Sequence, residues 1–355
     1  DTQDYRPAVH YINGEYWGII NVRERYDHHY LERVYGIAEG ELDFLELRGV
    51  GSDINEGDNI HWNNLFNFIL EEDLSEPSNY EYILTQMDEV NFIDYQLSNI
   101  FFRNTDWPGN NITYFRKKTA SYQEDAPYGQ DGRWRWLMYD TDYGFGFWGG
   151  PNSYEHNTLA FATEAGGTEW PNQDWSTLFL RKLLQNEVFK KQFVNRYADM
   201  INTTFLPERV LSIIDEMKET IADEIPYMQE RWLRPQYNWE TSQINTLNTF
   251  AVNRPAFARE HIKEYFDIAE DYLIEVDVSD EEQGFIQVNT IEINQNTPGV
   301  PADAYPWTGT YFEDIPITLK AIAKEGFVFT HWSGNFDSTD EEIEVDVPKV
   351  LEIVG

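Results

Sequence analysis

Residues 104–144 read NTDWPGNNITYFRKKTASYQEDAPYGQDGRWRWLMYDTDYG. Pro108 and Gly109 predict that no helix continues through the start of this stretch, because proline removes a helical hydrogen bond and glycine weakens a helix. Two apolar runs follow, ITYF and RWRWLMY, with a polar tip near residues 119–132 between them. They predict two paired strands, and the alternation of Trp134 and Trp136 with arginines predicts one buried face. The stretch therefore predicts a loop, a hairpin and a second, acidic loop.

A helix is expected immediately before this stretch, at about residues 89–103. Asp88 is a suitable N-cap. The apolar positions fall on one face at helical spacing. These positions are Val90, Ile93, Leu97, Ile100 and Phe101.

The rest of the chain predicts a mostly helical first part and a β-rich second part. Asn13-Gly14 between two aromatic and β-branched runs predicts a hairpin over residues 8–22. Short alternating runs after residue 270, such as DYLIEVDV and FVFTHW, predict a small β-sandwich. The fold class is α+β, with domains at 1–268 and 270–355.

The first part is expected to contain further helices and loops. A helix at about 26–36 ends at Gly36, a loop over 49–63 leads into a helix, and an irregular loop covers 150–175. Further helices are expected at about 176–204, 207–223 and 255–268, the last with Pro255 in its first turn.

Composition excludes several classes of protein. The chain has 355 residues, with 26 basic and 63 acidic side chains and a formal charge of −37. Such a charge repels phosphate backbones and anionic lipid, so we expect no nucleic-acid partner and no polybasic membrane patch. No cysteine is present, which excludes disulfides and thiolate chemistry. No apolar run approaches 18 residues, so no membrane insertion is expected.

The polar residues of the two loops suit a hard cation. Asp106 and Asn111 precede the predicted hairpin, and Asp140 and Asp142 follow it. Mg²⁺ takes carboxylate or amide oxygens and completes its shell with water and phosphate. In protein kinases an aspartate acts as base, an asparagine five residues later binds metal, and an Asp-x-Gly aspartate binds metal. Asp106 to Asn111 has that spacing, and Asp142 begins Asp-Tyr-Gly; each pattern alone is also common in turns.

Three segments in the same order resemble the CotH family, the spore-coat-protein-H-like proteins. The segments are NGEYWGIINVRERYDHHYL (13–31), NTDWPGNNITYFRKK (104–118) and GRWRWLMYDTDYGFG (132–146). The resemblance covers about residues 5–265. It implies an atypical protein kinase that uses ATP with Mg²⁺ or Mn²⁺ to phosphorylate protein hydroxyls.

The resemblance also implies roles for individual residues. Asp106 looks like the catalytic acid of the loop, and Asn111 like its metal-binding partner. One or both of Asp140 and Asp142 look like the metal-binding acid. Glu24 resembles a structural or nucleotide-side acid. Family members carry an earlier segment, which we expect to be missing before the first hairpin here, and Arg23 and Lys117 are candidate phosphate contacts in its place.

Two further groups of residues contain metal-ligating side chains, and only the first is a candidate metal site. Asp53, Asn55 and Asp58 hint at an irregular Ca²⁺ site, so a structural Ca²⁺ ion is a second expected cofactor. An EF-hand is excluded, because Gly57 is at position five and Asn64 at position twelve of the loop. His28 and His29 are neighbours that point about 100° apart on a helix, so they do not share a metal.

Two main functional classes remain open from the sequence, with a structural protein stabilised by Ca²⁺ as a third hypothesis. One is a protein kinase. The other is a non-catalytic extracellular surface protein that binds glycan or protein through its aromatic loops. The segments AYPWTGTYF (304–312) and GFVFTHWSG (326–334) resemble β repeat modules of secreted bacterial proteins. This resemblance implies an extracytoplasmic, bacterial location and cell-surface partners for the β part.

Overall fold

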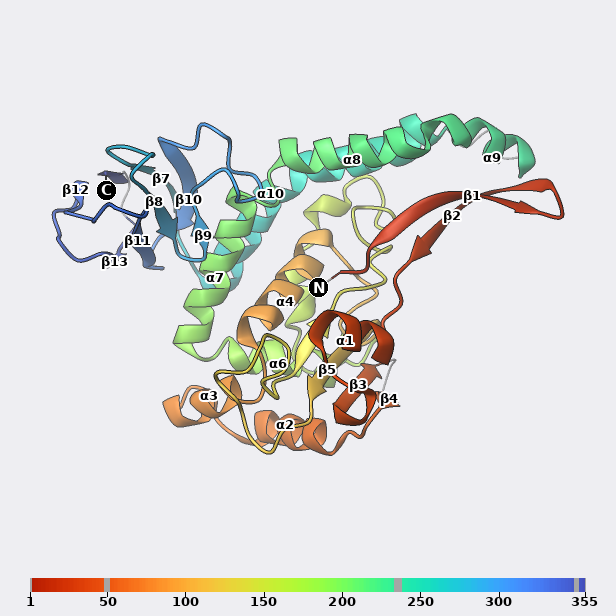
Figure 1. Ribbon diagram of the computed structural model, residues 1–355, viewed down its shortest axis with the longest axis horizontal. Helices are drawn as coiled ribbons and strands as arrows, with labels where there is room; N and C mark the ends of the chain where they lie inside the picture. Colours follow the sequence, from red (N-terminus) through yellow and green to blue (C-terminus); the bar gives the residue numbers. More distant parts are fainter. Residues whose placement is uncertain (1, 48–51, 233–237, 348–350, 355) are drawn as a thin grey trace. The chain divides into compact units, whose positions relative to one another are not determined.

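The computed structural model describes residues 2–47, 52–232, 238–347 and 351–354 (Figure 1). It confirms an α+β fold, with a mostly helical first part and, toward the C-terminus, two sheets that are antiparallel except where β14 pairs in parallel with β7. Contacts divide the chain into two compact units. Unit 1 comprises Asp1–Glu187 and Ser212–Phe250, and unit 2 comprises Val188–Leu211 and Ala251–Gly355. The units do not follow a single cut in the sequence, and the predicted domains 1–268 and 270–355 stay a prediction.

The predicted N-terminal hairpin is present in unit 1. Strand β1 (Tyr5–Ile12) pairs with β2 (Glu15–Arg23) in antiparallel register. Asn13 and Gly14 have φ angles of 52° and 83°. Both central residues of a type I′ turn need positive φ, and this is why Asn-Gly at this position specifies the hairpin.

A four-stranded antiparallel sheet forms the centre of unit 1, in the order β4-β3-β5-β6. Its strands are β3 (Leu42–Leu47), β4 (Ser52–Glu56), β5 (Ile112–Lys117) and β6 (Arg135–Leu137). On one face, Phe44, Phe115 and Leu137 pack in a core with helix α1 (His28–Tyr35). Alternate side chains point to opposite faces of a strand, and on the other face Trp62 stacks on Tyr114 at 4.0 Å between ring centroids. Trp62 belongs to helix α2 (Ile60–Glu71). Helices therefore cover both faces of the sheet, and β5 and β6 lie between them.

Helix α4 (Glu89–Phe102) confirms the helix predicted before the first loop. The Asp88 carboxylate accepts a hydrogen bond from the Asn91 N–H, as an N-cap should. The predicted apolar face is buried except at Val90, which is 63% exposed. The prediction for Val90 was wrong, because this first-turn residue borders an open cavity and not the core.

Other predicted boundaries needed correction. The segment 49–63, predicted as a loop, contains strand β4, although residues 49–51 lie outside the described residues. The predicted helix 176–204 is two helices. Pro255 lies inside its helix and not in the first turn, because this helix begins ten residues earlier than predicted. The remaining helices are α2 (Ile60–Glu71), α3 (Pro77–Leu84), α5 (Thr158–Ala162), α6 (Asp174–Leu183), α7 (Glu187–Asn202), α8 (Pro207–Ile221), α9 (Ile225–Arg231) and α10 (Asn245–Phe266).

Unit 2 combines helical segments with two four-stranded sheets, ordered β10-β7-β14-β12 and β13-β11-β8-β9. The buried Asp199 carboxylate on α7 accepts hydrogen bonds from the hydroxyls of Tyr311 and Thr290, at 2.8 and 2.6 Å. The run FVFTHW (327–332) is not a strand, and Val328 is exposed. The strands are β7 (Asp271–Asp277), β8 (Gly284–Val288), β9 (Ile291–Glu292), β10 (Trp307–Phe312), β11 (Ile317–Ala323), β12 (Ser333–Gly334), β13 (Glu342–Val345) and β14 (Leu351–Val354). Among the described helices of the chain, none is long and apolar enough to cross a membrane.

Candidate functional site

The two predicted loops meet at one edge of the central sheet. Asn111 directly precedes β5, and Asp140 follows β6 by three residues. Because β5 and β6 are adjacent and antiparallel, the start of one and the end of the other lie at the same edge. The N–H of Phe145 donates a 2.8 Å hydrogen bond to the carbonyl of Phe102, which ties the second loop to the end of α4. The sheet register therefore brings together residues up to 36 positions apart, Asp106 to Asp142.

A hydrogen-bond chain fixes the first loop. The Asn111 side-chain amide donates to the Asp106 carboxylate at 2.8 Å. The Asp106 N–H donates to the Asn104 side chain at 3.2 Å, and Asn104 donates to the Asn99 side chain at 2.9 Å. Asn99 and Asn104 are buried, so the loop is anchored to α4. These contacts orient the Asp106 carboxylate and the Asn111 amide toward each other.

The backbone at the site has unusual conformations. Asn111 has a φ of 56° and Asp140 a φ of 51°, both in the left-handed region. Asparagine and aspartate tolerate this region better than most other residues. Gly144 ends the Asp-Tyr-Gly turn, where an added Cβ would lie 2.9 Å from the Thr141 carbonyl oxygen and 3.1 Å from that of Phe102. The turn therefore needs glycine for its close approach to α4.

Three carboxylates interact electrostatically at this site. Burial raises the pKa of Asp106, the Asp142 charge raises it further, and hydrogen bonds from Asn110 and Asn111 oppose the rise. Burial also raises the pKa of Asp140, as do the charges of Asp142 and Asp106, while Arg23 lowers it. Like charges held close together disfavour ionisation. A bound cation would relieve this repulsion, and carboxylate and amide oxygens are the ligands that Mg²⁺ and Mn²⁺ prefer.

The three residues predicted on the nucleotide side, Arg23, Glu24 and Lys117, lie in different surroundings. Arg23 ends β2 and interacts with the charge of Asp140. Glu24 accepts hydrogen bonds from the Arg33 guanidinium and from the Asp4 N–H. Lys117 lies at the far end of β5, with its ammonium 3.5 Å from the Glu41 carboxylate. The structure brings Arg23 to the carboxylates and does not bring Lys117 there.

Sequence reasoning missed several neighbours of the site. Arg103 directly follows α4 and donates a 3.3 Å hydrogen bond to the Thr105 hydroxyl, next to Asp106. The Tyr139 hydroxyl donates to the Glu46 carboxylate at 2.9 Å. Arg103 could have been noticed as a cation three residues before Asp106, whereas nothing in the sequence relates Glu46 to Tyr139. The Arg103 contact is local, two residues along the chain, whereas the Tyr139–Glu46 hydrogen bond depends on tertiary structure.

The residues predicted to bind Ca²⁺ do not form one loop. Asp53 and Asn55 lie in strand β4, and Asp58 follows Gly57 as the chain enters α2. The Asp58 carboxylate accepts a 3.0 Å hydrogen bond from the Ile60 N–H. Asp58 thus acts as a local turn residue, and the structural Ca²⁺ ion stays a prediction.

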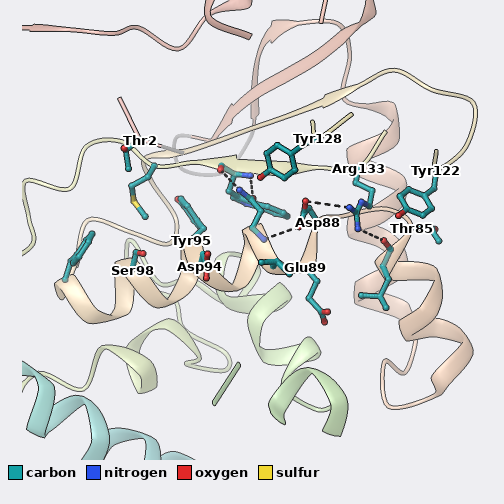
Figure 2. Close-up of a pocket in the computed structure, with 16 residues that line it drawn as sticks. Thr2, Thr85, Asp88, Glu89, Asp94, Tyr95, Ser98, Tyr122, Tyr128 and Arg133 are labelled. Carbon is teal, nitrogen blue, oxygen red and sulfur yellow. Dashed lines mark hydrogen bonds and ion pairs between the residues drawn. The ribbon is translucent and has the colours of Figure 1, made fainter. Parts of the chain in front are cut away.

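A cavity of about 740 Å³ runs along α4 (Figure 2). Its wall includes Asp88, which lies 3.7 Å from the Arg133 guanidinium and 2.8 Å from that of Arg135. Trp134 and Trp136 are buried, which confirms the prediction that they pack in the core. The residues that line the cavity include none of Asp106, Asn111, Asp140 and Asp142.

Comparison with known proteins agrees with the motifs. The family model described as CotH kinase protein matches residues 1–258 and so includes every residue of the candidate site. Among curated proteins, none matches the chain. The family match covers well over half of the 355 residues. The chain therefore belongs to the CotH kinase family and contains a kinase-like domain.

Proposed function

We propose that this protein is an atypical protein kinase, which transfers the γ-phosphoryl group of ATP to protein hydroxyls with Mg²⁺ or Mn²⁺. The observation that supports this proposal most directly is the electrostatic interaction of Asp106, Asp140 and Asp142 at one edge of the sheet. Asn111 is hydrogen-bonded to Asp106 there. Phosphoryl transfer depends mainly on positioning and on neutralising charge. A group of oxygen ligands beside a carboxylate of raised pKa meets both needs.

Each residue then has a separate role. Asp106 would orient the substrate hydroxyl and accept its proton, and the raised pKa of its carboxyl favours that step. Asn111, Asp140 and Asp142 would hold the cation. When bound, the cation would neutralise charge on the phosphates. The Asn99–Asn104 hydrogen bonds keep the Asp106 loop in place while the hydroxyl reacts.

Two arginines are placed to supply positive charge. The charge of Arg23 acts on Asp140, and Arg103 lies three residues before Asp106. Arginine remains charged at every working pH and can contact phosphate with two N–H groups. We propose that Arg23 and Arg103 contact the phosphates, in preference to Lys117, whose ammonium is occupied by Glu41 and Gln130.

A thermal melt with Mn²⁺, with and without ATP, tests the proposal. At 100 times its Kd, a ligand adds about 2.7 kcal/mol to the free energy of unfolding. This corresponds to a rise of several degrees, since 1 kcal/mol shifts Tm by about 2–4 °C in domains of 150–250 residues. Asp142→Ala should abolish the ATP-dependent rise.

Asp125→Ala is the matched control, because Asp125 is exposed in the turn between β5 and β6. This variant should keep the full shift. An ATP-dependent shift that survives in Asp142→Ala, or no shift in the unaltered protein, would contradict nucleotide binding at this site. A positive result is followed by transfer of radiolabelled γ-phosphate to a protein acceptor.

A further inference from the structure

A second group of metal-ligating side chains lies outside the carboxylate site, in unit 1. His28 begins α1, Glu39 begins the short 3-10 helix Glu39–Glu41, and Glu56 ends β4. Each offers a ligand atom within 4.8 Å of those of the other two. The His28 Nδ1 lies 2.9 Å from a Glu56 carboxylate oxygen. Three elements distant in sequence therefore converge on one point.

The backbone around these three residues is well defined. The Asp27 carboxylate caps α1 by accepting a 3.0 Å hydrogen bond from the Tyr30 N–H. Glu56 is opposite Phe44 in the β3–β4 pair, and Phe44 packs in the core with α1. Ligands on fixed elements need little reorganisation to close on an ion.

The charge balance favours a cation. A neutral His28 leaves the two carboxylates as two negative charges within 4.8 Å of each other, and on the cavity wall the cation Arg25 is outnumbered by the acids Asp27 and Glu46. Even a protonated His28 neutralises only one of them. A divalent ion would neutralise both, in a chain whose formal charge is −37.

The space for an ion and its water ligands is also present. A cavity of about 580 Å³ is lined by His28 and Glu56, together with Glu46 and Asn55. The latter two carry further oxygen atoms on the cavity wall. Histidine and glutamate bind Zn²⁺ at about 2.0–2.2 Å, so two ligand atoms of one ion are at most about 4.4 Å apart. Small side-chain rotations would bring the three residues within that limit.

We propose that His28, Glu39 and Glu56 bind one Zn²⁺ ion, with water from the cavity as a further ligand. An imidazole nitrogen with two carboxylates favours a transition metal over Mg²⁺ or Ca²⁺, which prefer oxygen ligands alone. Its three ligands are distinct from the residues of the proposed nucleotide site. His29 is not part of it, which agrees with the expectation that the two neighbouring histidines do not share a metal.

Calorimetric titration of the metal-free full chain with Zn²⁺, without nucleotide, tests the site. We expect one strong site per chain, and His28→Phe should weaken it at least tenfold. His29→Phe is the matched control, because it keeps the ring that lies 4.0 Å from that of His28 and removes only nitrogens. Glu39→Gln should also weaken binding at least tenfold, whereas Glu32→Gln, at an exposed position on α1, should not.

Two further measurements distinguish this site from the three carboxylates and from weak binding to the acidic surface. Co²⁺ in place of Zn²⁺ should give visible absorption that disappears in His28→Phe and persists in Asp142→Ala. Binding should weaken at acid pH, because a ligating histidine must lose its proton. Loss of Zn²⁺ binding in Asp142→Ala but not in His28→Phe would overturn the proposal, as would several weak sites that no substitution changes. Circular dichroism of each variant checks that it is folded.

Discussion

Charged side chains flank strand β6 at both ends, and the two groups differ in their balance of positive and negative charge. Before the strand, the Asp131 carboxylate accepts hydrogen bonds from the Arg135 guanidinium at 2.6 and 2.8 Å, and Asp88 lies beside the same guanidinium. After the strand, Asp140 and Asp142 lie together, and Asp140 also interacts with the charge of Asp106. The first group pairs opposite charges, whereas the second gathers like charges.

The pKa values of the two groups move in opposite directions. Burial raises the pKa of Asp131, but hydrogen bonds from Arg135 and Arg133 outweigh burial and bring it to about 2. At Asp106 and Asp140, burial and neighbouring carboxylates raise the pKa together. Internal pairing stabilises the fold, while unbalanced charge leaves binding capacity for a ligand. This difference separates the structural aspartates from the candidate functional ones.

The largest expected effect is on the rate of phosphoryl transfer. Asp106→Asn keeps the shape of the side chain but removes the base, so we expect the rate to fall by about 10²–10⁴-fold. The Kd for ATP, measured by calorimetry, should change little, since Asp106 is not among the proposed cation ligands. A rate within threefold of that of the unaltered protein would remove Asp106 from the mechanism.

The next largest effect is on stability. Asp131→Ala leaves the Arg135 guanidinium, which is 1% exposed, without its two shortest contacts. Breaking a buried pair costs about 3–5 kcal/mol, and the remaining Asp88 contact places this variant near 3 kcal/mol. Urea denaturation followed by circular dichroism measures the change. A loss below about 1 kcal/mol would show that Asp88 alone can hold Arg135.

The acid dependence of stability tests the low pKa of Asp131. Its pKa is about 2 when folded, against about 3.9 unfolded, so its contribution is complete above pH 4 and is lost as the pH falls to 2. With allowance for solvent screening, we expect this contribution of Asp131 to the free energy of unfolding to be about 2 kcal/mol. Between pH 4 and 2, Asp131→Asn should therefore lose less stability than the unaltered protein. Equal losses of stability in the two proteins would contradict the low pKa assigned to Asp131.

The smallest effect has the opposite sign. The raised pKa of Asp140 means that its ionisation opposes folding, and the penalty appears as the pH rises through the folded pKa. Asp140 is exposed, so solvent screening leaves only a small gain, and Asp140→Asn should be more stable at pH 7 by about 0.5 kcal/mol. The gain should vanish below the unfolded pKa of about 3.9. Melts with EDTA at pH 7 and pH 3 provide the measurement, and a lower Tm at pH 7 would contradict the like-charge description of the site.

Local sequence signals predicted the elements that frame the site. Asn13-Gly14 specified the first hairpin and Asp88 the start of α4, whereas α4 ends at Phe102, with Arg103 in the left-handed region, before Pro108 and Gly109 are reached. These signals act within a few residues through positive φ, capping and loss of helical geometry. Predictions failed where context decides the outcome. Pro255 lies inside α10, and Val90 on an apolar stripe is exposed.

The sequence by itself determined the family, the α+β class and the order of Asp106, Asn111, Asp140 and Asp142, because motif spacing and backbone preference are local properties. Only the tertiary structure decided which of these side chains share a charge environment. It also decided that Lys117 lies at the far end of β5, and that His28 meets Glu39 and Glu56. The physical reason is that strand pairing and helix packing set distances between residues far apart in the chain. Electrostatic interactions depend on those distances and on burial, neither of which sequence spacing contains.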